Sequence, residues 1–85
     1  MENICYGDAE LIKRVADGRR ILINMGCRIR YLRLSGGWTQ EELAEMAGLS
    51  AKYVGEVERG EKNPTYLVMI QIAGAIGVKM KDLFQ

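Results

Sequence analysis

The stretch from Thr39 to Gly60 constrains the fold of this chain most, because it has the pattern of two short helices joined by a tight turn. Thr39 is followed three residues later by Glu42, which is the spacing of a capping box at a helix start. Gly48 stands where the chain must reverse, and a glycine adopts positive φ there without strain. Ser50 then suits the N-cap of a second helix.

The apolar residues of this stretch recur at helical spacing. Trp38 and Leu43 occupy the positions of a hydrophobic staple at the first helix. Ala44 is small on the side where the second helix must cross. We expect the inward face to consist of Leu43, Ala47, Val54 and Val57. This is the anatomy of a helix-turn-helix, whose second helix can enter the major groove of DNA.

Six short motifs in the same order carry a resemblance to a known family. They are Arg-Ile-Arg-x-Leu-Arg (28–33), Thr-Gln-Glu-Glu-Leu-Ala (39–44), Gly-Leu-Ser (48–50), Glu-Arg-Gly (58–60), Asn-Pro-Thr (63–65) and Ile-Ala-x-Ala-Ile-Gly-Val (72–78). From about Gly26 to Phe84 the chain resembles the phage-repressor and Cro-type helix-turn-helix transcriptional regulators. The resemblance implies an all-α, compact five-helix domain that binds double-stranded DNA. It also implies an ion pair between Arg33 and Glu58.

Length and composition exclude several classes of protein. Eighty-five residues suit one small domain, so we expect no domain for a small-molecule effector. No apolar run is long enough to span a membrane, and the N-terminus lacks the features of a secretory signal. We therefore expect a cytoplasmic protein. The resemblance implies a bacterial or phage source and association with the nucleoid when the protein is bound to DNA.

Candidate catalytic and metal-binding residues are few. The chain has no histidine and only two cysteines, Cys5 and Cys27, which we interpret as ordinary reduced residues, with redox sensing or metal binding as the alternatives. It has no phosphate-binding loop and no paired carboxylates suited to acid–base chemistry. We expect no metal, no cofactor and no enzymatic activity.

Positive charge is unevenly distributed along a chain whose net charge is only +1. Residues 19–36 carry five arginines and no acid, whereas residues 37–60 carry five glutamates against Lys52 and Arg59. A subunit with so little net charge neutralises few phosphates, so useful affinity for DNA would need two subunits.

The N-terminal part lies outside the resemblance. We expect residues 1–20 to form an arm and a short helix that starts at Asp8 and ends near Gly18, preceding a domain over 21–85 with its helix-turn-helix at 39–60. This segment could cover the core of its own subunit or pack on a partner. A further helix is expected from about Arg20 to Leu34, and whether Gly26 interrupts it stays open. Its expected apolar stripe consists of Ile21, Met25, Ile29 and Leu32.

After the helix-turn-helix, Thr65 is expected to cap another helix that ends at Gly77, followed by a short helix over residues 80–84. The expected core residues here are Tyr66, Met69, Ile72, Ala73, Ile76, Leu83 and Phe84. Leu67 and Val68 stand where relatives of the resembled family usually carry polar residues. A helix that is apolar around most of its girth needs a second surface, so we predict a dimer contact built on Leu67, Val68, Ile70 and Gly74. The alternative is that these residues widen the core of the monomer.

The helical period divides the second helix of the motif into two faces. The outward face, predicted to read bases, consists of Ala51, Lys52, Gly55 and Glu56. Contacts to phosphate are predicted for Gln40, Tyr53, Arg59, Lys62, Asn63 and Thr65.

The sequence therefore predicts a sequence-specific transcriptional regulator. It would occupy a pseudo-palindromic operator as a homodimer and act as a repressor or autoregulator. The alternative is an antitoxin-like DNA-binding protein that neutralises a partner protein through residues 1–20 or the surface from Leu67 to Ile70.

Overall fold

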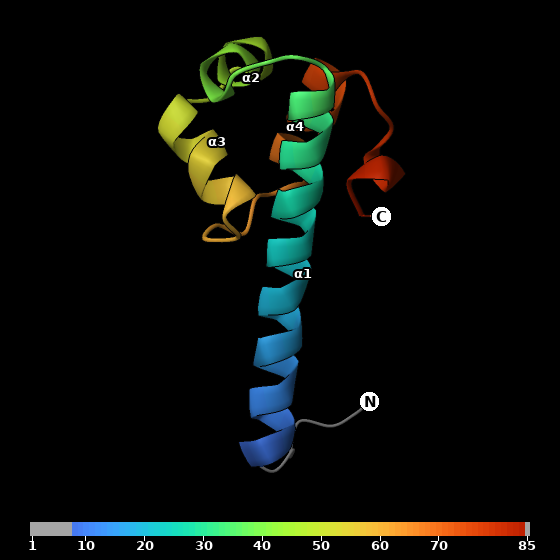
Figure 1. Cartoon of the computed structure of the whole chain (residues 1–85). Coiled ribbons are helices and arrows are strands. Elements are labelled where there is room, and N and C mark those ends of the chain that lie inside the picture. Colours follow the sequence, from blue (N-terminus) through green and yellow to red (C-terminus); the bar gives the residue numbers. More distant parts are fainter. Residues whose placement is uncertain (1–7, 85) are drawn as a thin grey trace.

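The computed structural model describes the backbone of residues 8–84 and the side chains from residue 17 onward. This part of the chain is all-α, as expected. Four α-helices precede a short 3-10 helix: α1 (Asp8–Ser35), α2 (Gln40–Ala47), α3 (Ala51–Glu58), α4 (Tyr66–Ile76) and η1 (Met80–Phe84). In Figure 1, α3 and η1 lie on opposite sides of α1, and the N-terminal half of α1 extends away from the other helices.

Helix α1 is one uninterrupted helix of 28 residues. The prediction that Gly18 ends a first helix is therefore wrong, and the expected boundary between residues 20 and 21 falls within α1. A glycine inside a helix costs about 1 kcal/mol relative to alanine, which good helix formers on both sides can offset. Four other glycines have the positive φ of a turn, whereas Gly18 does not. Gly26 does not interrupt the helix either.

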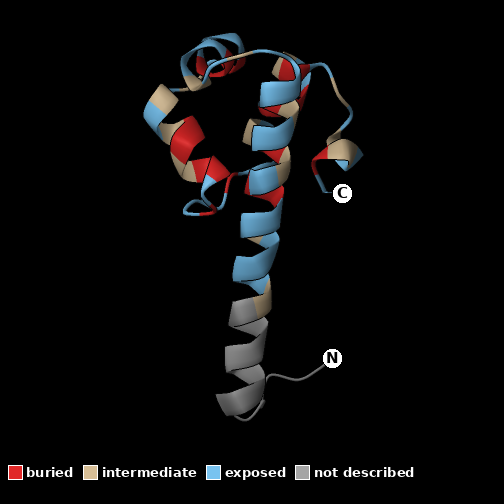
Figure 2. Ribbon diagram, viewed as in Figure 1, coloured by how far each residue is buried: buried red, intermediate tan, exposed pale blue. Residues whose placement is uncertain are grey.

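The core lies where α1, α2, α3 and α4 converge, and Figure 2 shows the buried residues on their facing sides. The inward face predicted for the helix-turn-helix is confirmed: Leu43, Ala47, Val54 and Val57 are all buried. The remaining buried apolar residues are Met25, Ile29, Ala44, Ile72, Ala73, Ile76 and Leu83.

Three residues expected in the core lie outside it. Tyr66, the first residue of α4, is 66% exposed. Ile21 and Phe84 are 57% and 53% exposed, because both border an open hollow between α1 and the end of the chain.

Two glycines let the C-terminal end of α3 approach α1 closely. A Cβ added to Gly26 would lie 2.5 Å from the carbonyl oxygen of Val57 and closer still to that of Glu58. Gly60, whose φ is +76°, faces the helix one turn earlier, where a Cβ would lie 2.7 Å from Cγ1 of Ile23. Side chains at these positions would push α3 away from α1.

The predicted caps of α2 and α3 are confirmed. The Glu42 amide donates to the Thr39 hydroxyl at 3.0 Å, and the Thr39 amide donates to the Glu42 carboxylate at 2.8 Å, which completes the capping box. Gly48 ends α2 with a φ of +74°. The Ser50 hydroxyl accepts from the amide of Tyr53 at 3.1 Å and so starts α3 at the predicted place.

Candidate nucleic-acid interface

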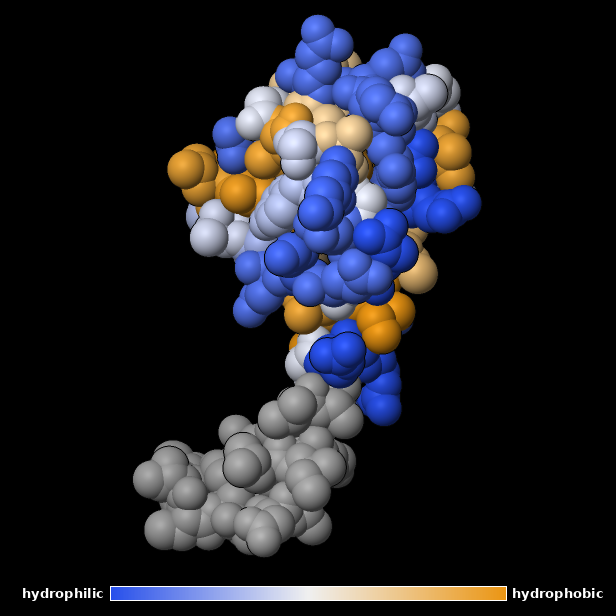
Figure 3. All heavy atoms as spheres, turned by 90° about the vertical axis from the view of Figure 1, so that its left-hand side faces the viewer, coloured by the Kyte–Doolittle hydropathy of each residue, from blue (hydrophilic) through white to orange (hydrophobic). Residues whose placement is uncertain are grey.

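The outer side of α3 is the surface that could enter a DNA groove. Lys52 is exposed, and Ala51, Tyr53 and Glu56 are half-buried. Hydrophilic side chains gather over this face of the molecule, which Figure 3 turns toward the viewer. The helix thus presents a cation, a carboxylate and a methyl group, which are the kinds of groups that recognise base edges.

Gly55 is not on this outward surface, so its predicted position is wrong. The residue is buried because the side chains of Gln40 and Arg59 lie over it. A Cβ at Gly55 would lie 3.2 Å from Nη1 of Arg59 and 3.4 Å from Oε1 of Gln40. Helical periodicity gives the direction of a side chain from its own helix, but it cannot reveal that a neighbouring helix covers the position.

Behind this surface, a buried ion pair joins the end of α3 to α1. Nε of Arg33 donates to Oε2 of Glu58 at 2.6 Å, and Nη2 donates to Oε1 at 3.0 Å. Nη1 of Arg33 also donates to the carbonyl oxygen of Trp38 at 2.9 Å, just before α2. The hydrogen bond to Glu58 raises the pKa of Arg33 above its ordinary value. The pair implied by the resemblance thus joins α1, the start of α2 and the end of α3.

Gln40 extends the same network toward solvent. Its Nε2 donates to Oε1 of Glu58 at 3.0 Å, and its side chain is half-buried. Gln40 is the first residue of α2, where backbone N–H groups have no partners within the helix and suit an anion. The residue therefore lies beside backbone amides that suit an anion.

The other predicted phosphate ligands follow α3 along the chain. Lys62 and Asn63 are exposed in the loop before α4. The hydroxyl of Thr65 accepts from the amide of Val68 at 3.2 Å, so this oxygen already caps α4 as expected.

Arg59 forms an exposed ion pair with Glu61, in which its Nε donates to Oε2 at 2.8 Å. This hydrogen bond raises the pKa of Arg59 and lowers the pKa of Glu61. The positive charge of Arg59 is therefore shared with a neighbouring carboxylate before any DNA approaches.

The apolar surface of α4 is only partly buried in the core. Leu67 and Ile70 are 65% and 42% exposed, and Gly74 is exposed with open space around it. Val68 is half-buried and packs against the core. Of the four residues predicted to form a dimer contact, Val68 thus also belongs to the monomer's own packing.

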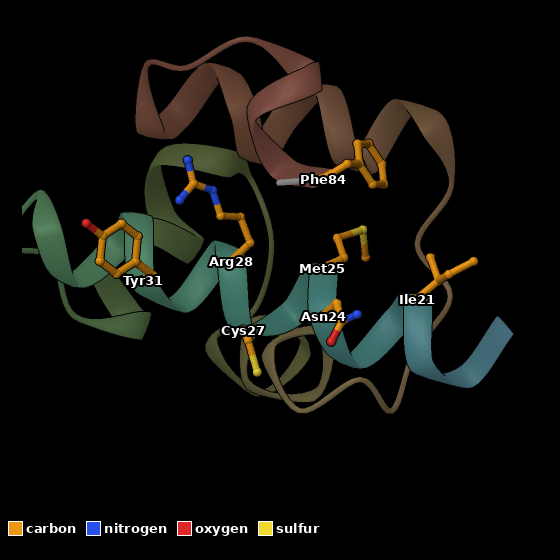
Figure 4. Close-up of a pocket in the computed structure, with 7 residues that line it drawn as sticks. All are labelled: Ile21, Asn24, Met25, Cys27, Arg28, Tyr31 and Phe84. Atoms are coloured by element: carbon orange, nitrogen blue, oxygen red, sulfur yellow. The ribbon is translucent and has the colours of Figure 1, made fainter. Parts of the chain in front are cut away.

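A hollow of about 680 Å³ lies between α1 and η1. Figure 4 shows its lining residues: Ile21, Asn24, Met25, Cys27, Arg28, Tyr31 and Phe84. Arg28 spans its edge, with Nε donating to the carbonyl oxygen of Asp82 at 2.8 Å and the guanidinium 5.4 Å from the ring centre of Tyr31. Because η1 and α3 lie on opposite sides of α1, this hollow is separate from the candidate nucleic-acid interface.

The part of the chain that the structure describes contains no candidate metal site, because no three or more of its histidine, cysteine, aspartate or glutamate residues lie together. No helix there is long and apolar enough to cross a membrane. Cys27 is exposed as a free thiol, and Cys5 lies outside the described residues.

The family of this chain follows from its similarity to known proteins. The model of the helix-turn-helix family matches residues 29–83, which include all of α2, α3 and α4. The chain belongs to this family. An uncharacterized HTH-type transcriptional regulator of Sinorhizobium fredii is 37% identical to the helix-turn-helix protein over 59 residues, which are 69% of this chain and 77% of that regulator.

Two further matches carry more descriptive names. The immunity repressor protein of Bacillus phage phi105 is 36% identical over 61 residues, which are 72% of this chain and 42% of the repressor. The crystal structure of the restriction-modification controller protein C.AhdI from Aeromonas hydrophila is similar with a TM-score of 0.73 and 40% identity, covering 74% of this chain and 96% of that one. The helix-turn-helix protein is thus a DNA-binding transcription regulator of the repressor-like type, a class distinct from enzymes.

Proposed function

We propose that this helix-turn-helix protein occupies a specific pseudo-palindromic operator as a homodimer and acts there as a repressor or autoregulator. The observation that carries the proposal is the joint placement of Lys52, exposed on α3, and Gln40, which α3 holds at the start of α2. One supplies a group for base edges and the other a group for the phosphate backbone. The similarity to a phage immunity repressor and to a controller protein supports the regulatory role.

The proposed base contacts come from three residues of α3. Lys52 donates to O6 and N7 of guanine, Glu56 accepts from N4 of cytosine, and Ala51 touches the methyl group of thymine. Gly55 lies beneath Gln40 and Arg59, so in this proposal it provides space and makes no direct base contact.

The proposed phosphate contacts surround α3. Gln40 and the first backbone amides of α2 bind one phosphate, as suits a helix N-terminus. The remaining contacts come from Tyr53 on the flank of α3 and from the region after it, namely Arg59, Lys62, Asn63 and Thr65. Since Arg59 is paired with Glu61, its contact requires that this exposed ion pair opens or is shared with the phosphate.

The proposed dimer forms through α4. Leu67 and Ile70 give it an exposed apolar surface, Val68 flanks them, and Gly74 leaves room for close approach. In a two-fold dimer of this class the two recognition helices lie about 34 Å apart, which is one turn of DNA. A net charge of only +1 per subunit favours such an arrangement, because two subunits double the number of phosphate contacts.

Selection of bound sequences from random DNA, performed with the full chain, tests this proposal. The expected result is an inverted repeat whose half-sites lie about 10 base pairs apart, centre to centre. The control is Lys79→Ala, an exposed lysine in the loop before η1, which should select the same repeat. Recovery of no enriched sequence would contradict a specific operator.

The antitoxin-like alternative predicts binding to a partner protein. No contact among residues 17–84 favours it over the regulator, and the relatives named above are regulators, a repressor and a controller. We therefore propose the regulator alone.

A further inference from the structure

One side of α1 follows the end of α3 and the loop between α3 and α4. Helix positions three, four and seven residues apart share a face, so Arg19, Ile23, Gly26 and Arg33 lie on one side of α1. Gly26 meets the carbonyl groups at the end of α3, and Ile23, one turn earlier, meets Gly60 of the loop. Figure 1 shows this loop beside α1.

The same side of α1 brings Arg19 to the exposed part of the loop. A single turn separates Arg19 from Ile23, which is a rise of only about 5.4 Å. As α1 is followed toward its N-terminus, its neighbours pass from the end of α3 to Gly60, and the next residues of the loop are Glu61 and Lys62, both exposed. Arg19 is itself exposed. Arg19 and Lys62 therefore border the same stretch of surface.

The charge of Arg19 is not neutralised by its own helix. The positions three and four residues away on either side of it are apolar, and residues 18–40 include no acid. The carboxylate of Asp17 accepts a hydrogen bond from the neighbouring Arg20 at 3.3 Å. Among the side chains of residues 17–84, Arg19 forms no ion pair.

The loop adds a second positive charge to this surface. Lys62 follows Glu61 directly, and the carboxylate of Glu61 is already bound by Arg59 at 2.8 Å. Neighbouring cations repel each other, so anions between them stabilise both. The phosphates of a DNA strand are a regular row of such anions, and a guanidinium can donate two parallel hydrogen bonds to one phosphate.

We propose that Arg19 binds the DNA backbone at the phosphate next to the one bound by Lys62, so that α1 extends the candidate nucleic-acid interface. The inference rests on the proposed function, in which Lys62 binds phosphate. Arg19 precedes residues 29–83, which match the family model, so the contact comes from the part of α1 outside that match. A continuous helix carries Arg19 on a rigid element, which lowers the entropy lost on binding.

Charge-removing variants of the full chain test this contact: Arg19→Gln, Lys62→Gln and the two combined. Glutamine has a helix propensity close to that of arginine but no charge. The matched control is Lys81→Gln, an exposed lysine in η1, which lies on the side of α1 opposite α3. Fluorescence anisotropy measures affinity for the selected operator over a series of salt concentrations. Ethylation interference identifies the contacted phosphates, and circular dichroism gives the thermal midpoint.

Arg19→Gln should reduce the slope of log affinity against log salt by about 0.9 per subunit. For a dimer, its loss of affinity relative to the unmodified chain should then shrink roughly 3-fold with each doubling of the salt concentration. The preferred operator sequence should not change, because a phosphate contact reads no base. Interference should disappear at one phosphate of each half-site, adjacent to the phosphate lost in Lys62→Gln. Lys81→Gln should bind as the unmodified chain does.

The outcomes separate the two proposals. If Lys62→Gln changes neither the slope nor the interference pattern, the loop contact in the proposed function is wrong. If Lys62→Gln loses a phosphate and Arg19→Gln does not, the contact from α1 is overturned and the proposed function stands. A reduced slope with an unchanged interference pattern would mean that Arg19 acts only through its long-range field, which also overturns the contact. Weaker binding of Arg19→Gln together with a lower thermal midpoint would overturn it in favour of a structural role.

Discussion

Arg33 in α1 and Glu58 in α3 form an ion pair with two hydrogen bonds, of 2.6 Å and 3.0 Å, whose side chains are only 7% and 2% exposed. Removing two charges from water costs about as much as their attraction returns, so such a pair adds little net stability over an apolar one. Its effect is on geometry, because a guanidinium and a carboxylate pair well in few orientations. The pair therefore fixes the angle at which α3 packs against α1.

Glu58→Ala is expected to lower the free energy of unfolding by about 3–5 kcal/mol, because it leaves the guanidinium of Arg33 buried without its partner. The double variant Arg33→Met with Glu58→Leu removes both charges and should be less destabilised than Glu58→Ala alone. Urea unfolding followed by circular dichroism gives both values. A double variant that is less stable than Glu58→Ala would mean that the pair itself stabilises the fold.

Gly26→Ala should lower the free energy of unfolding by about 1–3 kcal/mol, because the new Cβ would collide with the carbonyl groups at the end of α3. Those atoms belong to the backbone and cannot turn aside. Gly18→Ala, in the same helix with open space around it, should instead stabilise the chain by up to about 1 kcal/mol. Opposite shifts of the urea midpoint are the expected result, and equal shifts would contradict the close crossing.

The features that could be predicted from sequence depend on residues that are neighbours along the chain. The capping box at Thr39, the reversal at Gly48 and the cap at Ser50 each involve atoms within a few residues, and all three are present. The inward face of α2 and α3 follows from helical spacing alone, and it is also present. The ion pair of Arg33 with Glu58 joins distant residues, and only the family resemblance implied it.

The features that could not be predicted depend on contacts between elements far apart in the chain. Glycine is common at helix ends, but α1 continues through Gly18 because nothing in its surroundings requires a turn. Gly55 points outward from its own helix, but Gln40 covers it from another. Phe84 was expected to be buried with Leu83, but it faces an open hollow. Helical periodicity predicts on which face of its helix a residue lies. Which other element packs against that face depends on the whole fold.

Arg59→Gln should raise the pKa of Glu61, since the hydrogen bond from Arg59 is the main cause that lowers it. Because the pKa of this carboxyl is depressed in the folded chain, the pair's small contribution to stability is present above the unfolded pKa and is lost as pH falls through the folded value. An NMR titration of the Glu61 carboxyl measures the change. Arg30→Gln, which alters an exposed arginine on α1, should leave the Glu61 titration unchanged.

Lys52→Ala should weaken operator binding and relax the base preference at one position of each half-site, an effect of about 1–3 kcal/mol if the lysine donates to guanine. Binding titrations on operators altered at single positions separate this outcome from a loss of general attraction. Lys79→Ala provides the matched removal of one exposed lysine. If Lys52→Ala leaves affinity and base preference unchanged, another residue of α3 reads the bases.

Leu67→Glu tests the surface on α4 where the subunits are proposed to meet. Leu67 is 65% exposed in the single chain, so a glutamate there should leave the monomer folded. In the dimer, the glutamate of each subunit would be removed from water, so the interface would contain two buried negative charges. The dissociation constant of the dimer should therefore rise by at least about 30-fold, the size of a hot-spot substitution.

Sedimentation equilibrium measures this constant, and Leu34→Glu is the control because that leucine, at the end of α1, is also exposed, at 54%. Only Leu67→Glu should shift the population toward monomer. Since a lone subunit makes half of the phosphate contacts, the operator titration of the same variant should move to higher protein concentration. Undiminished dimerisation of Leu67→Glu would mean that the subunits meet on another face, whereas a monomeric unmodified chain would mean that the operator itself brings them together.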